Sequence, residues 1–394
     1  MNAVDQALQS PATESSEPPS SPTENHDKMS AECAALTATW APDLAVQVLI
    51  RPSNRASSTP AEPCPDGVTD AVRSAGSRLG TGRKLIRHLR SDLSQRAAEL
   101  LTLLPQAEPL WLADALGVTV PVGRLAELAR RPDVRRIELQ PIVQPARRSH
   151  ETTGRTAATP ELELELGPQD VGLLPRIALL DSATISPDFA AGDPALTVDP
   201  YDPVGNRWLA TLQELIPEAR LLPIRVFEPG PGPHPQGTFA HVVLGLQRAL
   251  EQEADLVLLD LGEQALSPVW HLPLLNCTLH GTSVAVAGFA AGLEGEPSLP
   301  IHLPLAGCYA GGPLRTDLQV SGTALGRHGL AGSLAAACRA AAAITLIQRV
   351  APKLRHRPDL VAGLLFGGSG RARRPGGNIP LDAGSALRAA LSAA

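Results

Sequence analysis

Continuous apolar runs, separated by amphipathic stretches, dominate the chain from residue 175 onward. The runs RIALLD, ARLLPIRVF, ADLVLLDLG and TSVAVAGFA each have the length of a strand, and FAHVVLGLQRALEQE between two of them has the period of a helix. Continuous apolar strands joined by helices are typical of a parallel sheet covered on both faces. The sequence therefore predicts an α/β domain over residues 175–370.

The carboxyl ends of such strands are where an open parallel sheet carries its chemistry. Asp181, Gly262 and Phe289 each stand at the end of an apolar run. Residues 334–346 are rich in Ala and Leu without Gly or Pro, and Pro352 marks a stop, which predicts a buried helix. Ser333 precedes this helix, where it could either cap the free backbone N–H groups or act as a nucleophile.

A smaller unit is predicted upstream of the α/β domain. Residues 83–105 carry Leu and Ala at helical spacing, and the following segments predict a strand, a short helix and a second strand at 109–122, 123–132 and 133–143. This order gives a small α+β module over residues 83–147.

The remaining segments are predicted to be tails and linkers. Residues 1–82 begin as a disordered tail rich in Ser, Pro, Thr and Glu and continue as a linker with one strand at 44–50. Residues 148–174 are polar and predict a linker between domains, and residues 371–394 predict a tail or short helix.

Composition and charge narrow the classes of function. The net charge is -6, which gives no electrostatic reason to expect nucleic acid as a partner. The 5 cysteines are widely spaced without a C-x-x-C pair, so they suggest neither a disulfide framework nor a zinc site. No clustered carboxylate loop of the calcium-binding type is present, and we expect no metal and no cofactor.

The sequence also gives an expectation for the compartment. The N-terminus shows no basic start followed by an apolar segment, and no run of about 18 uncharged apolar residues occurs. We therefore expect a cytoplasmic protein that does not use a membrane as a partner.

Five segments of the larger domain resemble, in the same order, motifs of the subtilisin-like serine proteases, or subtilases. RIALLDSA is similar to the strand that ends in D-S-G, and PEARLLPIRVF to the strand P-x-A-x-L-x-x-V-K/R-V. GTFAHVVLGLQRALEQEADLVLLDLG looks like the family's next helix and the strand that ends in S-L-G. VAVAGFAAG looks like the strand A-A-G-N-x-G. AGSLAAACRAAAAITLIQRVAP resembles G-T-S-M-A-x-P-H-V-A-G-A-A-A-L and its helix. The likeness spans residues 175–368 and implies a subtilisin-like fold.

The upstream module resembles the inhibitor-like prodomain that precedes many bacterial subtilases. In that prodomain a leucine-rich helix, a strand with Trp, a short helix and an R-P-D-V-x-x-I-E strand follow one another. The residues that carry the likeness are Trp111, Leu112, Ala115, Val118, Leu125, Leu128, Arg131, Pro132, Asp133, Val134, Ile137 and Glu138. The resemblance implies that the module covers the cleft of the larger domain.

The resemblance also implies a catalytic triad, of which only part is present. It places Asp181 at the acid position and Ser333 at the nucleophile position. The family's histidine lies in G-H-G-T-x-V-A-G, but residues 202–220 contain no histidine, and Asn206 after Gly205 fits that position best. An amide cannot take up a proton near neutral pH. Phe289 stands where the family has its oxyanion-hole asparagine, and it cannot donate a hydrogen bond.

Three functions follow from this pattern. The first is a pseudoprotease whose degenerate cleft binds a protein or peptide without hydrolysing it. The second is an active serine endopeptidase that uses Asp181, Ser333 and a recruited base such as His241; His234 and His328 fit that role less well. The third is a non-catalytic regulator or scaffold for a partner protease, with the upstream module occupying the cleft.

Overall fold

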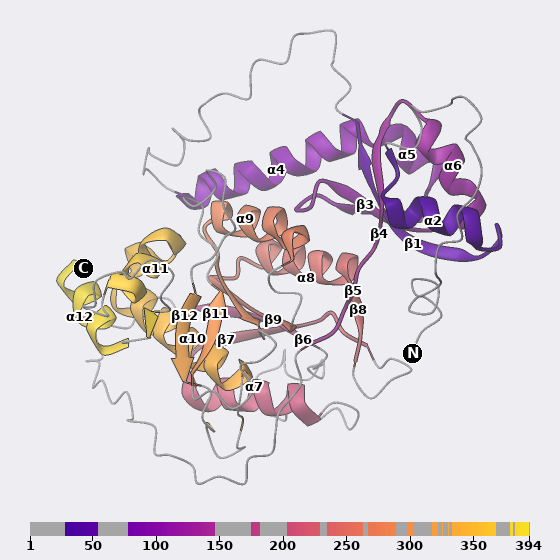
Figure 1. Cartoon of the computed structure of the whole chain (residues 1–394). Helices are drawn as coiled ribbons and strands as arrows, with labels where there is room; N and C mark the ends of the chain where they lie inside the picture. The colour runs from indigo at the N-terminus through magenta and orange to yellow at the C-terminus, as the bar shows by residue number, and fades with distance from the viewer. Residues whose placement is uncertain are drawn as a thin grey trace, which may run out of the picture.

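The computed structural model describes residues 28–53, 78–145, 175–181, 203–228, 235–262, 267–288, 298–302, 317–321, 325, 330, 333–367, 379–380 and 383–393 (Figure 1). The predicted tail before residue 28 and the predicted linker at 148–174 lie outside the described residues, as do Phe289, His234 and His328.

A seven-stranded sheet forms the centre of the larger unit, with the order β13-β12-β11-β10-β9-β6-β7. Four neighbouring strands that pair in parallel are the predicted apolar runs, β6 (Arg176–Asp181), β7 (Arg220–Arg225), β9 (Leu256–Gly262) and β10 (Ser283–Gly288). β11 (Ser298–His302) and β12 (Asp317–Ser321) extend the sheet antiparallel, and β13 (Ile379–Pro380) pairs parallel with β12.

Helices cover both faces of this sheet, which confirms the predicted class of fold. α7 (Pro203–Leu215) and α10 (Ser333–Val350) pack on one face, in a core that they share with strand residues such as Ile177 and Leu179. α8 (Phe239–Glu251) and α9 (His271–His280) pack on the other face with Ala178 and Leu180. Alternate residues of a strand point to opposite faces, so each strand needs apolar side chains on both.

The larger unit, called the body below, is completed by short elements at its ends. β8 (Gly237–Thr238) precedes α8, the 3-10 helix η5 (Pro268–Trp270) precedes α9, and η6 (Pro352–Leu354) follows α10. α11 (Pro358–Gly367) and α12 (Ala383–Ala393) pack together and against α10. α12 lies in the range predicted as a tail or short helix.

The N-terminal module, residues 28–53 and 78–145, has a four-stranded antiparallel sheet with the order β2-β3-β1-β4. Its elements are α2 (Ala31–Thr39), β1 (Ala45–Pro52), α4 (Arg78–Arg96), α5 (Ala98–Leu103), β2 (Glu108–Leu110), β3 (Ala115–Pro121), α6 (Val122–Arg130) and β4 (Val134–Leu139). A last strand, β5 (Ile142–Val143), leaves the module and pairs with β8 of the body.

Three details of the module correct the sequence prediction. The strand predicted at 44–50 is β1, and it is a central strand that pairs with β3 and β4 rather than part of a linker. The single helix predicted at 83–105 is two helices, because Ala97 leaves the helical conformation between α4 and α5. The single strand predicted at 109–122 is two strands, because Asp114 has a φ of 52° and the chain turns there.

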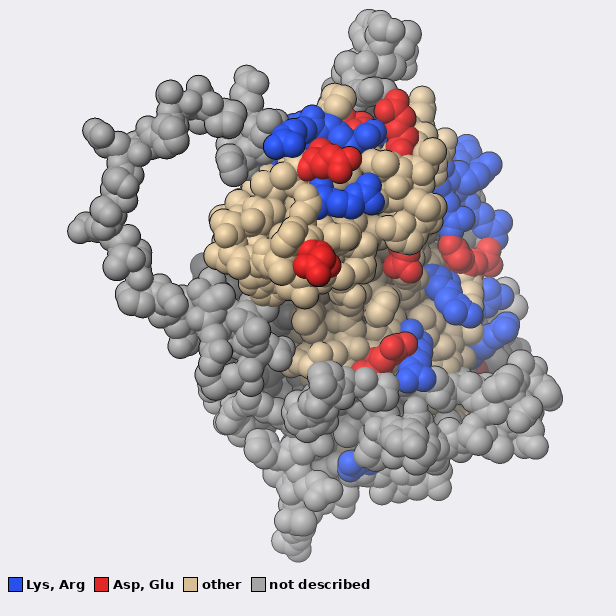
Figure 2. Space-filling view, turned by 90° about the vertical axis from the view of Figure 1, so that its right-hand side faces the viewer, with Lys and Arg blue, Asp and Glu red and all other residues tan. Residues whose placement is uncertain are grey.

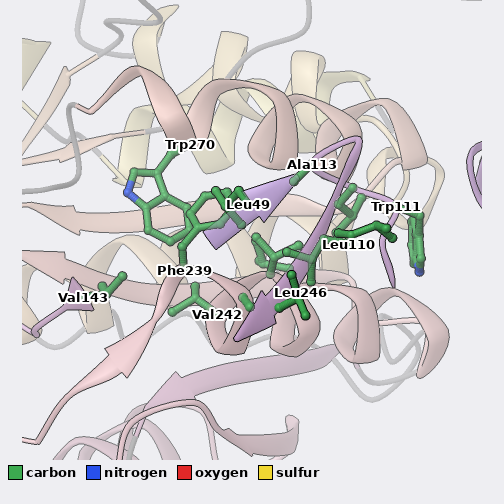
Figure 3. Close-up of a cluster of buried hydrophobic side chains, with 14 of the residues drawn as sticks. Leu49, Leu110, Trp111, Ala113, Val143, Phe239, Val242, Leu246 and Trp270 are labelled. Carbon is green, nitrogen blue, oxygen red and sulfur yellow. The ribbon is translucent and has the colours of Figure 1, made fainter. Parts of the chain in front are cut away.

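The module packs on the α8/α9 face of the body, and the two units share one hydrophobic core. Figure 3 shows Leu49 and Leu110 of the module together with Phe239, Leu246 and Trp270 of the body. The rings of Phe239 and Trp270 lie 4.8 Å apart between their centroids. The module is therefore packed as a further layer of the fold.

The outer face of the module carries charged side chains of both signs. Figure 2 shows Lys and Arg interspersed with Asp and Glu on this face, without a large area of one sign. Ion pairs such as Arg51 with Glu138 and Arg131 with Asp133 join the two signs. Within the part of the chain that the structure describes, no helix is both long and apolar enough to cross a bilayer.

Candidate functional site

The start of α10 lies at the carboxyl edge of the parallel strands. Near the other end of this helix, the side chain of Gln348 donates to Ser283 Oγ at 3.4 Å, at the beginning of β10. Just beyond the helix, Arg355 Nε donates to Asp255 Oδ1 at 3.1 Å, beside the beginning of β9. A helix rises about 1.5 Å per residue, so Ser333 lies roughly 22 Å from Gln348. That length matches a six-residue strand of about 20 Å, and Ser333 is therefore level with the carboxyl ends.

The start of α7 lies at the same edge for a similar reason. The N–H of Arg220, where β7 begins, donates to the carbonyl of Pro175 beside the beginning of β6 at 3.0 Å. Only a short turn separates this point from the end of α7. The helix therefore runs antiparallel to the strands, and its first turn, with Asn206, reaches their carboxyl edge.

Asp181 lies at the same carboxyl edge, at the end of a strand of the sheet. It is the last residue of β6 and is 2% exposed. It alternates with Ile177 and Leu179, so it faces α7 and α10. Its carbonyl accepts the N–H of Val226 at 2.8 Å, which fixes the end of the strand. The structure thus brings the backbones of Asp181, Asn206 and Ser333 to one edge of one face.

A second buried carboxylate, which the sequence reasoning missed, lies next to Asp181. Leu180 is in register with Leu259, so the following residues, Asp181 and Asp260, lie side by side on neighbouring strands. Asp260 is 1% exposed and alternates with Leu258, so it faces the same helices as Asp181. A single Asp inside the apolar run LVLLDLG was the signal that could have revealed it.

The strands on either side place different residues in register with this pair. Arg225 of β7 is in register with Asp181, but its side chain is exposed at the edge of the sheet. On the other side, Asp260 is in register with Ala287 of β10. Arg207 is half-buried in α7, one residue after Asn206, and it takes part in an interaction of its own.

His241, the predicted substitute base, lies on the other side of the sheet. It is exposed in the first turn of α8, where its backbone N–H donates to Thr238 Oγ1 at 3.2 Å. α8 covers the face opposite to α7 and α10. Among the side chains that the structure describes, no imidazole stands at the carboxyl edge on the face of Asp181.

Two other described histidines, the buried His280 and the half-buried His356, stand at the amino edge instead. His280 ends α9, is 3% exposed and has Nδ1 at 3.1 Å from Thr282 Oγ1. Burial, helped by the neighbouring His356, lowers the pKa of His280 to about 4. Burial also lowers the pKa of His356. Both are neutral near pH 7 and far from Asp181.

After the module, the chain runs along the edge of the body at β8, which is called the rim below. Ile142 pairs antiparallel with Thr238, and Val143 pairs with Gly237. The N–H of Phe239 donates to the carbonyl of Pro141 at 3.0 Å. A Cβ atom on Gly237 would stand 2.4 Å from the carbonyl oxygen of Val226, so a glycine is required there. Residues 141–143 thus add a short strand to the rim, just before α8 (Figure 1).

The described side chains form neither a metal site nor a reactive thiol. No group of three or more His, Cys, Asp or Glu in that part of the chain could hold a metal ion. The described cysteines, Cys33, Cys277 and Cys338, are buried free thiols. Burial raises the pKa of each of them, which keeps them protonated and unreactive.

Comparison with known proteins gives structural neighbours only. No family model and no curated protein sequence matches the chain. The similar solved structures include fervidolysin from Fervidobacterium pennivorans, described as a keratinolytic enzyme related to subtilisin, with 13% identity and a TM-score of 0.47. That match covers 88% of this chain and 61% of fervidolysin, so the chain spans about three fifths of its length.

Two further neighbours match a smaller part of the chain. The patellamide maturation protease PatA has 13% identity and a TM-score of 0.35, over 55% of this chain and 97% of its own. MycP1 with the N-terminal propeptide removed has 14% identity and a TM-score of 0.34, over 55% of this chain and 91% of its own.

Proposed function

We propose that this chain is a subtilase-like pseudoprotease, which binds an extended protein segment and does not hydrolyse it. The observation that carries the proposal is the carboxyl edge of the sheet. Asp181 and the starts of α7 and α10 lie at that edge, and the motif resemblance assigns Asn206, in the first turn of α7, to the position of the family's histidine. A serine hydroxyl without a base is a poor nucleophile.

The binding mode follows from the rim strand. An exposed strand edge recognises an extended peptide through main-chain hydrogen bonds, and pockets for alternate side chains provide selectivity. β8 already holds residues 141–143 in this way, with Val143 fully buried and Ile142 exposed. The natural partner is therefore an extended segment with a small apolar residue at the buried position, and the chain's own module is its competitor.

Self-cleavage tests the proposal. The full chain is purified and incubated, and its intact mass is followed, with Ser333→Ala as the control. An active subtilase with a prodomain is expected to cut between module and body, within residues 146–174. We expect the mass to stay unchanged in both proteins; a cut that appears only when Ser333 is present would establish the endopeptidase instead.

A second function is favoured by the extent of the module's contact with the body. A chain whose rim is already occupied could act as a regulator or scaffold for a separate protease. Affinity purification of the full chain then recovers a stoichiometric protease whose activity changes on binding. Recovery of peptides or non-protease proteins that compete with residues 141–143 supports the pseudoprotease.

A further inference from the structure

The module contacts the body along α8 and α9 as well as at β8, and part of this contact is remote from the candidate site. The first half of α4 continues along α9, as Figure 1 shows. Gly82 of α4 lies directly on the end of α9. A Cβ atom on Gly82 would stand 2.3 Å from the carbonyl oxygen of His280 and 2.9 Å from its imidazole Cδ2. The two backbones meet so closely that only glycine fits.

Charged side chains fix the position of α4 along the body. Arg83 forms an ion pair with Glu253, and Arg90 forms one with Glu251 at the end of α8. The guanidinium of Arg90 also lies 5.0 Å from the ring centroid of Trp111. Exposed ion pairs contribute little each, but together they select one register of the helix.

Buried hydrogen bonds cross between the two units at the centre of the contact. Asn276 of α9 is 6% exposed, and its Nδ2 donates to the carbonyl of Leu112 at 2.9 Å. Gln247 of α8 is 5% exposed, accepts the N–H of Leu112 at 3.4 Å and donates to the carbonyl of Pro109 at 3.3 Å. Both amides thus bind residues 109–112 of the module, at the end of β2 and in the turn that follows it.

Apolar packing surrounds these hydrogen bonds. Leu110 is 0% exposed and packs in the same core as Phe239 and Leu246 (Figure 3). Gly117 of β3 approaches α8 so closely that a Cβ atom would lie 3.0 Å from Ala240 Cβ. Removal of the module would expose this apolar surface to water together with two amides whose hydrogen bonds were made to the module.

We propose that the module is a permanent cover of the body, held at the amino edge by α4, and that cutting the chain between residues 145 and 175 does not release it. The rim strand of residues 141–143 then stays in place after such a cut. Access to β8 requires local displacement of that strand by a competing extended peptide, and removal of the module is not the activating step.

A nicked protein tests this proposal without using the chemistry of Ser333. A recognition sequence for a site-specific protease is inserted within residues 148–174 of the full chain, and the purified protein is cut. We expect the two pieces to co-elute in size-exclusion chromatography after dilution to nanomolar concentration and to unfold in one thermal transition. Elution of a folded body without the module would overturn the proposal.

Two matched variants locate the anchor. Gly82→Ala places a methyl group against the backbone of His280, whereas Gly363→Ala on α11 adds one where no atom lies within 4 Å. We expect the nicked Gly82→Ala protein to release its module at least about tenfold faster than the nicked Gly363→Ala protein. Equal release rates would contradict the role of α4.

A milder double variant covers the case in which Gly82→Ala does not fold. Arg83→Glu with Arg90→Glu reverses both exposed ion pairs and leaves the core untouched. We expect release from the nicked double variant to be several times faster than from the nicked parent and to slow again at high salt. A release rate that is equal in the parent and the double variant, and that does not change with salt, would contradict the proposed role of α4.

Discussion

The two faces of the parallel sheet are completed in different ways. The face that carries Asp181 is closed by α7 and α10 of the body, mostly through alanine and leucine side chains. The opposite face carries α8 and α9, and these helices bury their outer surface only when the module packs on them. The body is thus complete on the side of the candidate site and incomplete on the side of the module.

On the face of the candidate site, the residues that pack α7 into the core differ from the residue at the predicted histidine position. Trp208, Leu209 and Leu212 anchor α7 in its core, and Asn206 precedes these positions in the first turn of the helix. A change at position 206 therefore leaves the anchoring residues of α7 in place. On the other face the loss of a contact between the module and the body removes part of the core that the two units share.

The largest effect is expected from the shared core. Phe239 is fully buried and packs on Trp270. We expect Phe239→Ala to lower the free energy of unfolding by about 3–5 kcal/mol, measured by chemical denaturation. Leu391→Ala, at a leucine that is 48% exposed, is the control and should change it by less than about 0.5 kcal/mol. Similar losses would show that the two units do not share a core.

A pH dependence is the next largest effect. The pKa of His280 is lowered to about 4 in the folded protein, from an ordinary value of 6.5. The unfolded chain therefore binds the proton more readily, and stability that is present above pH 6.5 is lost as the pH falls toward 4. The shift corresponds to about 3 kcal/mol, and His356 acts in the same direction.

The histidine variants show whether this loss belongs to the amino edge. Between pH 6.5 and 4, His280→Gln should flatten the curve of unfolding free energy against pH, while His88→Gln at an exposed position of α4 should leave it unchanged. An unaltered curve in His280→Gln would assign the loss to other groups.

A smaller effect is expected from the buried amide between the units. Asn276→Ala leaves the carbonyl of Leu112 without its donor in a buried place. We expect a loss of about 1–3 kcal/mol, measured by thermal unfolding of the intact chain. A variant as stable as the parent would mean that water replaces the amide and that the contact is less closed than the structure shows.

The smallest effect is expected from the surface ion pair of α4. Arg90→Ala removes an exposed pair with Glu251 and should cost at most about 1 kcal/mol. The loss should shrink further as salt is added. A larger, salt-independent loss would show that the contact of Arg90 with the ring of Trp111 stabilises the fold more than the ion pair does.

The sequence predicted the elements that depend on local pattern. The four parallel strands and α10 follow from apolar runs and from an alanine-rich segment that ends before Pro352. β1 was assigned to a linker because its surroundings are rich in Pro and Ser, although its pairing with β3 and β4 makes it central. The turn at Asp114 is not predicted from the sequence, because no glycine or proline stands at that position.

The roles of the candidate site residues stay a prediction from the sequence. Asp181 and Ser333 were assigned from the order of motifs, and the structure places both at one edge of one face. Asp260 was missed because it lies within an apolar run and becomes notable only through its register beside Asp181. The contact of Gly82 with His280 joins residues far apart in the chain, and no local pattern reveals it.

The most direct test of the central claim is the reaction of Ser333 with a fluorophosphonate probe at neutral pH, with Ser333→Ala as the control. A serine whose hydroxyl lacks a base should not react, so we predict the same negligible labelling in both proteins. Labelling of the native chain that disappears in Ser333→Ala would contradict the account and establish a working nucleophile.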